Sequence, residues 1–189
     1  MSIDIREQLG IKGHFHLQAF DKDGALVDEV DEDNVILNIG LSALADALVA
    51  AAVAGTVSDD TFYAMQIGDD GALATDPMVP KIIDPATTTT MFHELGARTG
   101  GAGVFTRTAV ANAVQCQQTF AEATYVPADF LDAAKRYVNE AMLFLGKPAD
   151  LSSAWKPFAM RTFKSIPFGP ADAVTALIRW TFEIQRGTV

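Results

Sequence analysis

The sequence predicts a mainly β fold: an antiparallel β-sandwich of about eight or nine strands, with one main helix over residues 39–54 packed on it. Three observations carry this prediction. Residues 174–185 alternate between apolar and polar side chains, which is the period of a strand with one face in a core. Turn-forming residues separate several other short apolar runs, as in a sandwich rather than a βαβ array. One segment has a sustained helical period.

The predicted C-terminal strand, residues 171–186, organises the rest of the chain. Its apolar face consists of Val174, Ala176, Ile178, Trp180, Phe182 and Ile184. Two of these are large aromatic residues, which carry much of the buried apolar area of a core. We therefore expect the other strands to pair with this one or to cover its apolar face.

For the N-terminal third of the chain, the sequence predicts an arm, a hairpin and a helix. Residues 1–12 are assigned to a polar N-terminal arm, and residues 13–189 to one domain of the β-sandwich type. Residues 13–20 form a strand, residues 21–24 (DKDG) a turn, and residues 25–30 the returning strand. The acidic run over residues 28–33 is interpreted as a solvated strand end followed by a loop.

The helix is predicted to begin at Asn38 and to end before Gly55, because asparagine caps helices, alanine favours them and glycine ends them. Its apolar stripe consists of Leu41, Leu44, Ala45, Leu48, Ala51 and Ala52. We expect this stripe to pack over the open face of a sheet.

Further strands are predicted at residues 61–67, 104–110, 113–121, 137–145 and 158–166. In the strand over residues 113–121, Val114, Cys116 and Phe120 share a face on which Gln118 is the exception. Residues 73–90 contain three prolines and a run of four threonines, so we expect a long loop. Loops of this length in compact domains are usually functional or disordered.

The composition limits which binding partners and which cellular compartment we expect for this protein. The net charge of −10 repels nucleic acid, and we expect no nucleic-acid partner. The single cysteine excludes an internal disulfide, and residues 1–10 lack the apolar core of a signal peptide. The most apolar run, residues 43–55, is too short to span a bilayer and contains Asp46, so we expect no membrane partner. These features predict a protein made in a reducing cytoplasm.

Three groups of residues have ligand types that metals prefer. His14 and His16 share one face of a strand, with only His93 and Glu94 as further candidate ligands. Residues 21–32 partly match an EF-hand loop, but leucine occupies the position that needs glycine. The acidic residues of the third group are Asp69, Asp70, Asp76 and Asp84. A polar strand face, a hairpin turn and a solvated loop are the favoured interpretations, and we expect no metal and no cofactor.

The sequence contains no nucleophile elbow, P-loop or dinucleotide-binding glycine motif. Residues 100–103 (GGAG) neither follow an apolar strand nor open a helix, which argues against a phosphate site. We assign no catalytic residue and predict that the protein is not an enzyme.

Four segments, in this order, resemble a domain that recurs in structural proteins of tailed bacteriophages. Residues 34–45 (NVILNIGLSALA) are similar to its strand-to-helix entry, and residues 63–71 (YAMQIGDDG), followed by 93–98 (HELGAR), to its next element. Residues 137–144 (YVNEAMLF) and residues 158–167 (FAMRTFKSIP), with RWTF at 179–182, match the remainder. Met142 stands where the family usually has glycine, and Arg161 is offset by one position.

This resemblance implies a non-enzymatic structural component of a tailed-phage virion. Such a protein is made in the host cytoplasm and assembles in multiple copies on the particle surface, as a tail, collar or fibre-associated protein or as a capsid decoration protein. The implied partners are other virion structural proteins and further copies of the chain. The sequence places candidate contacts in the N-terminal arm and in irregular loops: Met1, Ile3, Ile5, Pro77, Pro80, Pro85 and Trp155.

Two other functional classes stay open at the level of sequence. The first is a carbohydrate-binding β-sandwich for host attachment, with Trp155 and Tyr125 as the aromatic residues near predicted loops. The second is a hydrolase, which would require a cleft with perturbed carboxylates.

Overall fold

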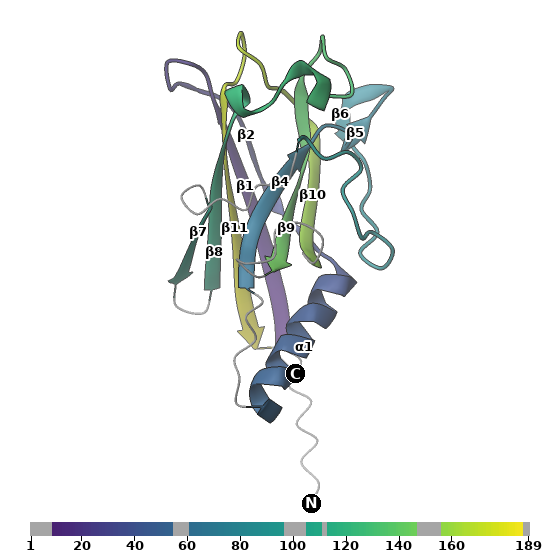
Figure 1. Ribbon diagram of the computed structural model, residues 1–189, viewed down its shortest axis with the longest axis vertical. Coiled ribbons are helices and arrows are strands. Elements are labelled where there is room, and N and C mark those ends of the chain that lie inside the picture. The colour runs from purple at the N-terminus through teal and green to yellow at the C-terminus, as the bar shows by residue number, and fades with distance from the viewer. Residues whose placement is uncertain (1–8, 55–60, 97–104, 111–112, 147–155, 187–189) are drawn as a thin grey trace, which may run out of the picture.

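Two antiparallel sheets pack face to face in the computed structural model (Figure 1), which describes residues 9–54, 61–96, 105–110, 113–146 and 156–186. The first sheet has five strands in the order β2-β1-β11-β8-β7. Their bounds are Leu9–Phe20 (β1), Leu26–Asp33 (β2), Phe105–Val110 (β7), Ala113–Ala121 (β8) and Thr175–Arg186 (β11). The long C-terminal strand is therefore the centre of this sheet, as its alternation predicts.

The second sheet has four strands in the order β3-β10-β9-β4. Their bounds are Val35–Ile36 (β3), Thr61–Gly68 (β4), Tyr137–Gly146 (β9) and Lys156–Pro167 (β10). A small third sheet pairs β5 (Ala72–Leu73) with β6 (Asp76–Pro80). The one α-helix in the described residues is α1 (Asn38–Ala54), and two short 3₁₀ turns, Glu122–Thr124 and Pro127–Asp129, precede β9. The predicted mainly β sandwich with one helix is confirmed.

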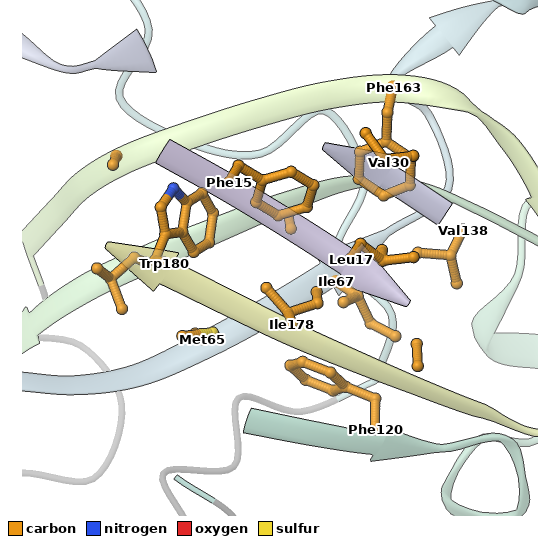
Figure 2. Close-up of a cluster of buried hydrophobic side chains, with 14 of the residues drawn as sticks. Phe15, Leu17, Val30, Met65, Ile67, Phe120, Val138, Phe163, Ile178 and Trp180 are labelled. Atoms are coloured by element: carbon orange, nitrogen blue, oxygen red, sulfur yellow. The ribbon is translucent and has the colours of Figure 1, made fainter. Parts of the chain in front are cut away.

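The main core lies between the two large sheets (Figure 2). The predicted inward face of β11 is confirmed where its side chains are described, because Ala176, Ile178, Trp180 and Phe182 are all buried. The ring of Phe15 on β1 lies 4.9 Å from that of Trp180 and 5.5 Å from that of Phe163 on β10. Aromatic residues of both sheets thus join the two layers.

The indole of Trp180 has a polar partner at the edge of this core. The Asn34 amide is oriented so that both of its polar atoms have partners. The Asn34 amide oxygen accepts a hydrogen bond from the Trp180 indole N–H, and the Asn34 amide nitrogen donates one to the Gly13 carbonyl. A Cβ at position 13 would overlap the Asn34 side chain, so glycine at this position makes room for the amide. The buried N–H of tryptophan is thereby satisfied.

A second, smaller core lies on the opposite face of the four-stranded sheet. It consists of Leu37, Ala64, Met91, Met142, Phe144 and Met160, with Val35 and Ile83 packed against it. Strand β9 is consequently buried on both faces, and nine of its ten residues are buried. A strand of this kind reads as a continuous apolar run rather than as an alternation.

Three sequence predictions need correction at their boundaries. Strand β1 begins at Leu9, so residues 9–12, expected in the arm, pair with β11. Strand β2 continues to Asp33, so the acidic run is an edge strand and not a loop. The predicted loop over residues 73–90 contains β6 and part of β5, and these two short strands, together with β3, raise the number in the described residues to eleven.

Basic residues of β10, in the four-stranded sheet, pair with acidic residues of the edge strand β2. Lys164 Nζ lies 2.6 Å from Asp28 Oδ1, and Arg161 pairs with Glu32. Charged residues on an edge strand discourage its pairing with other chains, which explains why an exposed strand is tolerated here.

Helix α1 begins against β10 and then extends past the ends of β9 and β10 (Figure 1). Its contact with the sheet uses small residues: Gly40 and Ala43 are buried, and a Cβ at Gly40 would lie 2.5 Å from the Phe158 Cα. The predicted packing face is only partly confirmed: Leu44 packs against the main core, whereas Leu41 is 39% exposed and Ala45 is exposed. The side chains of Leu48, Ala51 and Ala52 lie outside the described part of the helix. No helix in the described part of the chain is long and apolar enough to cross a membrane.

Candidate functional site

The candidate site is a surface segment, residues 72–95, which we call the flap. It begins with the β5–β6 hairpin and continues as coil across the outer face of the four-stranded sheet (Figure 1). Large apolar side chains point to solvent along it: Leu73, Met78, Val79, Ile82 and Phe92. Met78 is 61% exposed and Ile82 is 92% exposed, which is costly unless another surface covers them. The flap therefore has the character of a contact surface.

Glu140 anchors the C-terminal end of the flap to the centre of β9. Its side chain is fully buried, and Oε2 accepts a hydrogen bond from Phe92 N–H at 2.9 Å. Oε1 accepts from His93 N–H at 2.8 Å and more weakly from Asp70 N–H at 3.4 Å. One carboxylate thus satisfies backbone donors from two segments that are distant in sequence.

Burial raises the pKa of Glu140, and the backbone hydrogen bonds from His93, Phe92 and Asp70 oppose that rise without cancelling it. The negative charge of the Asp70 carboxylate contributes to the rise. A buried carboxyl of raised pKa is a common feature of active sites. Here both oxygens already accept hydrogen bonds from the main chain, so the group serves as a structural acceptor.

The start of the flap is held by the neighbouring Asn139. Its Oδ1 accepts from Gly71 N–H at 2.6 Å, and its Nδ2 donates to the Asp69 carbonyl and to Ser165 Oγ. Position 71 has no room for a side chain, because a Cβ at Gly71 would lie 2.3 Å from the Asn139 carbonyl oxygen. Gly71, the last glycine of the GDDG turn, is thus required by close packing on β9.

Lys81 fixes the middle of the flap. Its carbonyl accepts from Thr162 Oγ1 on β10 at 2.6 Å, and its own N–H donates to the Gly71 carbonyl at 2.7 Å. Its ammonium group lies 2.5 Å from Asp70 Oδ1 and 4.8 Å from the centre of the Phe92 ring. The flap is consequently tied to β9 and β10 at its start, middle and end.

The last residues of the flap also close the free edge of β4. Leu95 N–H donates to the Ile67 carbonyl at 3.0 Å, and Asp69 N–H donates to the His93 carbonyl at 3.3 Å. Gln66 Nε2 donates to the Leu95 carbonyl at 2.7 Å. These bonds satisfy backbone groups that an edge strand would otherwise leave for another chain.

A hollow of about 390 Å³ lies beside the base of the flap. Leu73, Pro77, Leu131, Asp69 and Asn139 are among the residues that line it. The Asp69 carboxylate is already committed, since Oδ1 lies 2.5 Å from His93 Nδ1 and Oδ2 accepts from Leu131 N–H at 2.7 Å. Its carboxylate therefore holds the surrounding loops together.

The predicted contact residues are only partly brought together. Pro77 and Pro80 lie on β6 of the flap and Pro85 on the coil that follows, with Pro77 and Pro85 exposed and Pro80 partly buried. Pro85 also links the flap to α1, because its carbonyl accepts from Asn38 N–H at 2.9 Å. The other predicted contacts, Met1, Ile3, Ile5 and Trp155, lie outside the described residues.

The candidate metal ligands are engaged in other contacts. His14 Nε2 lies 2.5 Å from Asp31 Oδ1, and His16 Nε2 lies 2.6 Å from Glu29 Oε1, both between β1 and β2. Asp21 accepts from the backbone of its own turn. Within the described ranges, no three histidine, cysteine or acidic residues lie close enough together to hold a metal ion.

The four acidic residues weighed as a calcium site do not form one cluster. Asp69 and Asp70 hold His93 and Lys81, whereas Asp76 accepts from Met78 N–H within its own hairpin. Hydrogen bonds from Ala86 N–H and the Thr87 side chain lower the pKa of Asp84, so this carboxylate caps a turn.

Of the two aromatic residues considered for carbohydrate binding, the structure describes Tyr125, which is partly buried and packs against the main core. The ring of Tyr125 lies 6.4 Å from that of Phe130 and 6.2 Å from that of Phe168, edge-on to both. Burial raises the pKa of the Tyr125 phenol, with a further contribution from the Asp129 carboxylate. This ring is not a free stacking platform for a sugar.

Comparisons with protein-family models, with curated proteins and with solved structures found no match to this chain.

Proposed function

We propose that the protein is a non-enzymatic structural component of a tailed-phage virion, which assembles in multiple copies on the particle surface. Its partners are other virion structural proteins and further copies of itself, and it is made in the host cytoplasm before assembly. The position on the particle is a tail, collar or fibre-associated site or a capsid surface.

The observation that carries this proposal is the convergence of the segments that resemble the phage domain. Strands β3, β4, β9 and β10 contain most of these segments, and they are the strands of one sheet. Glu140 of the YVNEAMLF segment accepts from Asp70 of the YAMQIGDDG segment and from His93 of the HELGAR segment. Motifs that are separate in sequence thus form one hydrogen-bonded unit, as expected of a structural signature.

The flap supplies the contact surface that an assembling subunit needs. Its exposed apolar side chains lie on backbone that is fixed to two central strands by Glu140, Asn139 and Thr162. A rigid surface loses little conformational entropy on binding, which favours repeated assembly of identical copies. The buried carboxylates around the flap act as anchors, which supports a structural role over a catalytic one.

Localisation on the particle tests the proposal. Virions from a lysate that contains the protein are labelled with a gold-tagged antibody shown to bind the native protein, and the same particles are analysed by mass spectrometry. We expect the protein in purified particles, with label over the head for a decoration protein or over the neck or tail for a tail-associated one. Its absence from particles in both assays would refute the proposal.

A pair of variants tests the role of the flap. Ile82→Asp places a charge on the most exposed apolar side chain of the flap, and Val27→Asp makes the same change at a position 50% exposed on β2. Both should change the free energy of unfolding by no more than about 0.5 kcal/mol, because both sites are on the surface. Incorporation into particles should fall for Ile82→Asp and stay normal for Val27→Asp. Equal incorporation of the two variants would exclude the flap as a virion contact.

A further inference from the structure

The exposed apolar side chains in the middle of the flap lie between two carboxylates. Asp76 precedes Met78 on β6, and Asp84 follows Ile82 on the coil, and all four side chains are exposed. Figure 1 shows β5, β6 and this coil on the outer side of the four-stranded sheet, where another protein can reach them. We call residues 76–84 the strip. Its outward surface is apolar in the middle and acidic at both ends.

Neither of these two carboxylates pairs with a cation in the part of the chain that the structure describes. Asp76 accepts a hydrogen bond from Met78 N–H at 3.0 Å. Asp84 accepts from Ala86 N–H and from Thr87 Oγ1, each at 2.9 Å. The bonds to Asp84 lower its pKa, so this carboxylate is ionised at neutral pH. Both ends of the strip thus carry an uncompensated negative charge.

Lys81, the lysine of the strip, does not compensate these charges. Its ammonium group lies 2.5 Å from Asp70 Oδ1 and 4.8 Å from the centre of the Phe92 ring. Its side chain is partly buried in this arrangement. The positive charge of Lys81 is therefore used within the chain, and the strip presents a net negative charge to a partner.

These charges determine the chemistry of the surface that can cover the strip. A partner that covers Met78 and Ile82 also removes water from the carboxylates beside them. A carboxylate that loses water without gaining a counter-charge opposes binding. Lysine or arginine opposite Asp76 and Asp84 removes this cost and also steers the approach of the partner. The complementary surface is therefore apolar in its centre and basic on both sides.

A second copy of this chain matches these requirements poorly. Two strips placed face to face would bring like charges together, which opposes association. Within the described ranges, most basic side chains already pair with carboxylates of their own chain: Lys12, Lys22, Lys81, Arg136, Arg161 and Lys164. The net charge of −10 adds a general repulsion between copies.

We infer that the flap binds a virion protein other than this chain, through an apolar surface flanked by lysine or arginine side chains. The inference rests on the proposed virion role and assigns the flap to one of the two kinds of partner in that proposal. Contacts between copies of the chain then use surfaces other than the flap.

Removing the two charges tests the electrostatic part of the inference. The double variant Asp76→Asn, Asp84→Asn keeps the side-chain oxygens that accept from the turns, because asparagine forms the same turns as aspartate. The double variant Asp21→Asn, Asp23→Asn is the matched control, since it removes two charges from another turn in which Asp21 accepts from the backbone. Melting temperatures should show that both variants fold.

Incorporation into particles should fall about tenfold or more for the flap variant and stay at the wild-type level for the control. Washing wild-type particles with rising sodium chloride should also release the protein, because salt screens charge pairs at an interface. Equal incorporation of the two double variants would overturn the charge complementarity, because it would show that the position of the lost charges is irrelevant.

Photo-crosslinking in purified particles tests the identity of the partner. Ile82 is replaced by the photoreactive amino acid benzoylphenylalanine, and the same replacement of Val27, exposed on β2, is the control. After irradiation, mass spectrometry should find position 82 joined to a different virion protein, in a segment that contains several lysine or arginine residues. Position 27 should not give this crosslink.

The outcomes separate this inference from the virion role. A crosslink from position 82 to a second copy, to a segment without basic residues, or to no protein at all would overturn the inference and leave the protein a virion component. Absence of the protein from particles would instead refute the virion role itself, and the inference would fall with it.

Discussion

Replacing Glu140 with alanine should release the flap from the four-stranded sheet. The wild-type carboxylate accepts two short hydrogen bonds, from Phe92 N–H at 2.9 Å and from His93 N–H at 2.8 Å, and one long bond from Asp70 N–H. A buried donor without a partner costs about 1–3 kcal/mol, so the two short bonds together represent about 2–6 kcal/mol. Removal of a buried carboxyl regains part of its desolvation cost. We therefore expect a net loss of about 2–4 kcal/mol in the free energy of unfolding.

Urea unfolding and amide hydrogen exchange measure this effect separately. Urea unfolding gives the free energy, and exchange should accelerate at the amides of Phe92 and His93 in particular, because these lose their acceptor. Asp23→Ala is the control, since it removes a carboxylate whose side chain is 73% exposed and should change the free energy by less than about 0.5 kcal/mol. If Glu140→Ala matched Asp23→Ala in free energy and in exchange at the two amides, the anchoring role of Glu140 would be refuted.

Four further predictions test other parts of the structure. Because burial raises the pKa of Glu140, protonation of this carboxyl adds stability at low pH, and this added stability is lost as the pH rises through the folded-state pKa. The wild type should therefore lose unfolding free energy relative to Glu140→Gln above about pH 4–5, and a constant difference across urea titrations at several pH values would contradict this. Gln118→Leu leaves Met65 N–H without its 2.9 Å acceptor and should cost about 1–3 kcal/mol in urea unfolding. Trp180→Ala should cost about 3–5 kcal/mol and abolish soluble expression; a variant as stable as the wild type would mean that the inward face of β11 is misassigned. Gly71→Ala places a Cβ 2.3 Å from a β9 carbonyl oxygen, so its melting temperature should fall, with a cost of about 1–3 kcal/mol.

The strands of the main core could be predicted because their signal is local. In β11 the alternation alone indicates which side chains are buried, and Trp180 and Phe182 have the exposure it predicts. The turn at Asp21–Gly24 could also be predicted from its residue types. In the structure Gly24 has a φ of 81°, and Asp21 accepts hydrogen bonds from the backbone at the hairpin turn. Patterns of this kind depend on few residues and not on the rest of the chain.

The direction in which α1 packs could not be predicted in the same way. Periodicity shows that Leu41 and Ala45 share a face, but it does not show whether that face meets the sheet. The outcome depends on how closely the helix approaches Phe158, which only the small residues on the other face allow. Leu41 and Ala45 are therefore left outside, whereas Leu44 of the same predicted stripe packs against the main core.

Two buried polar residues show what sequence reasoning missed in the candidate site. Gln118 breaks an apolar face of β8 because its side chain accepts from Met65 N–H on the opposite sheet. Glu140 follows Asn139 in a strand whose other buried residues are apolar, which is a visible anomaly, but its partners come from residues about 47 to 70 positions away. The anomaly marks a buried polar residue, and only the fold reveals what that residue binds.

The two-sided burial of β9 decides what kind of contact surface the flap can be. Met91 of the flap packs in the same core as Met142 and Phe144 of β9, so lifting the flap would expose this core to water. It would also break the hydrogen bonds to Glu140 and Asn139, whose buried polar groups would lose their partners. Both costs oppose opening of the flap. A partner that binds the exposed side chains of the flap thus meets a preformed surface, and the affinity of that contact depends on side-chain complementarity and not on ordering of a loop.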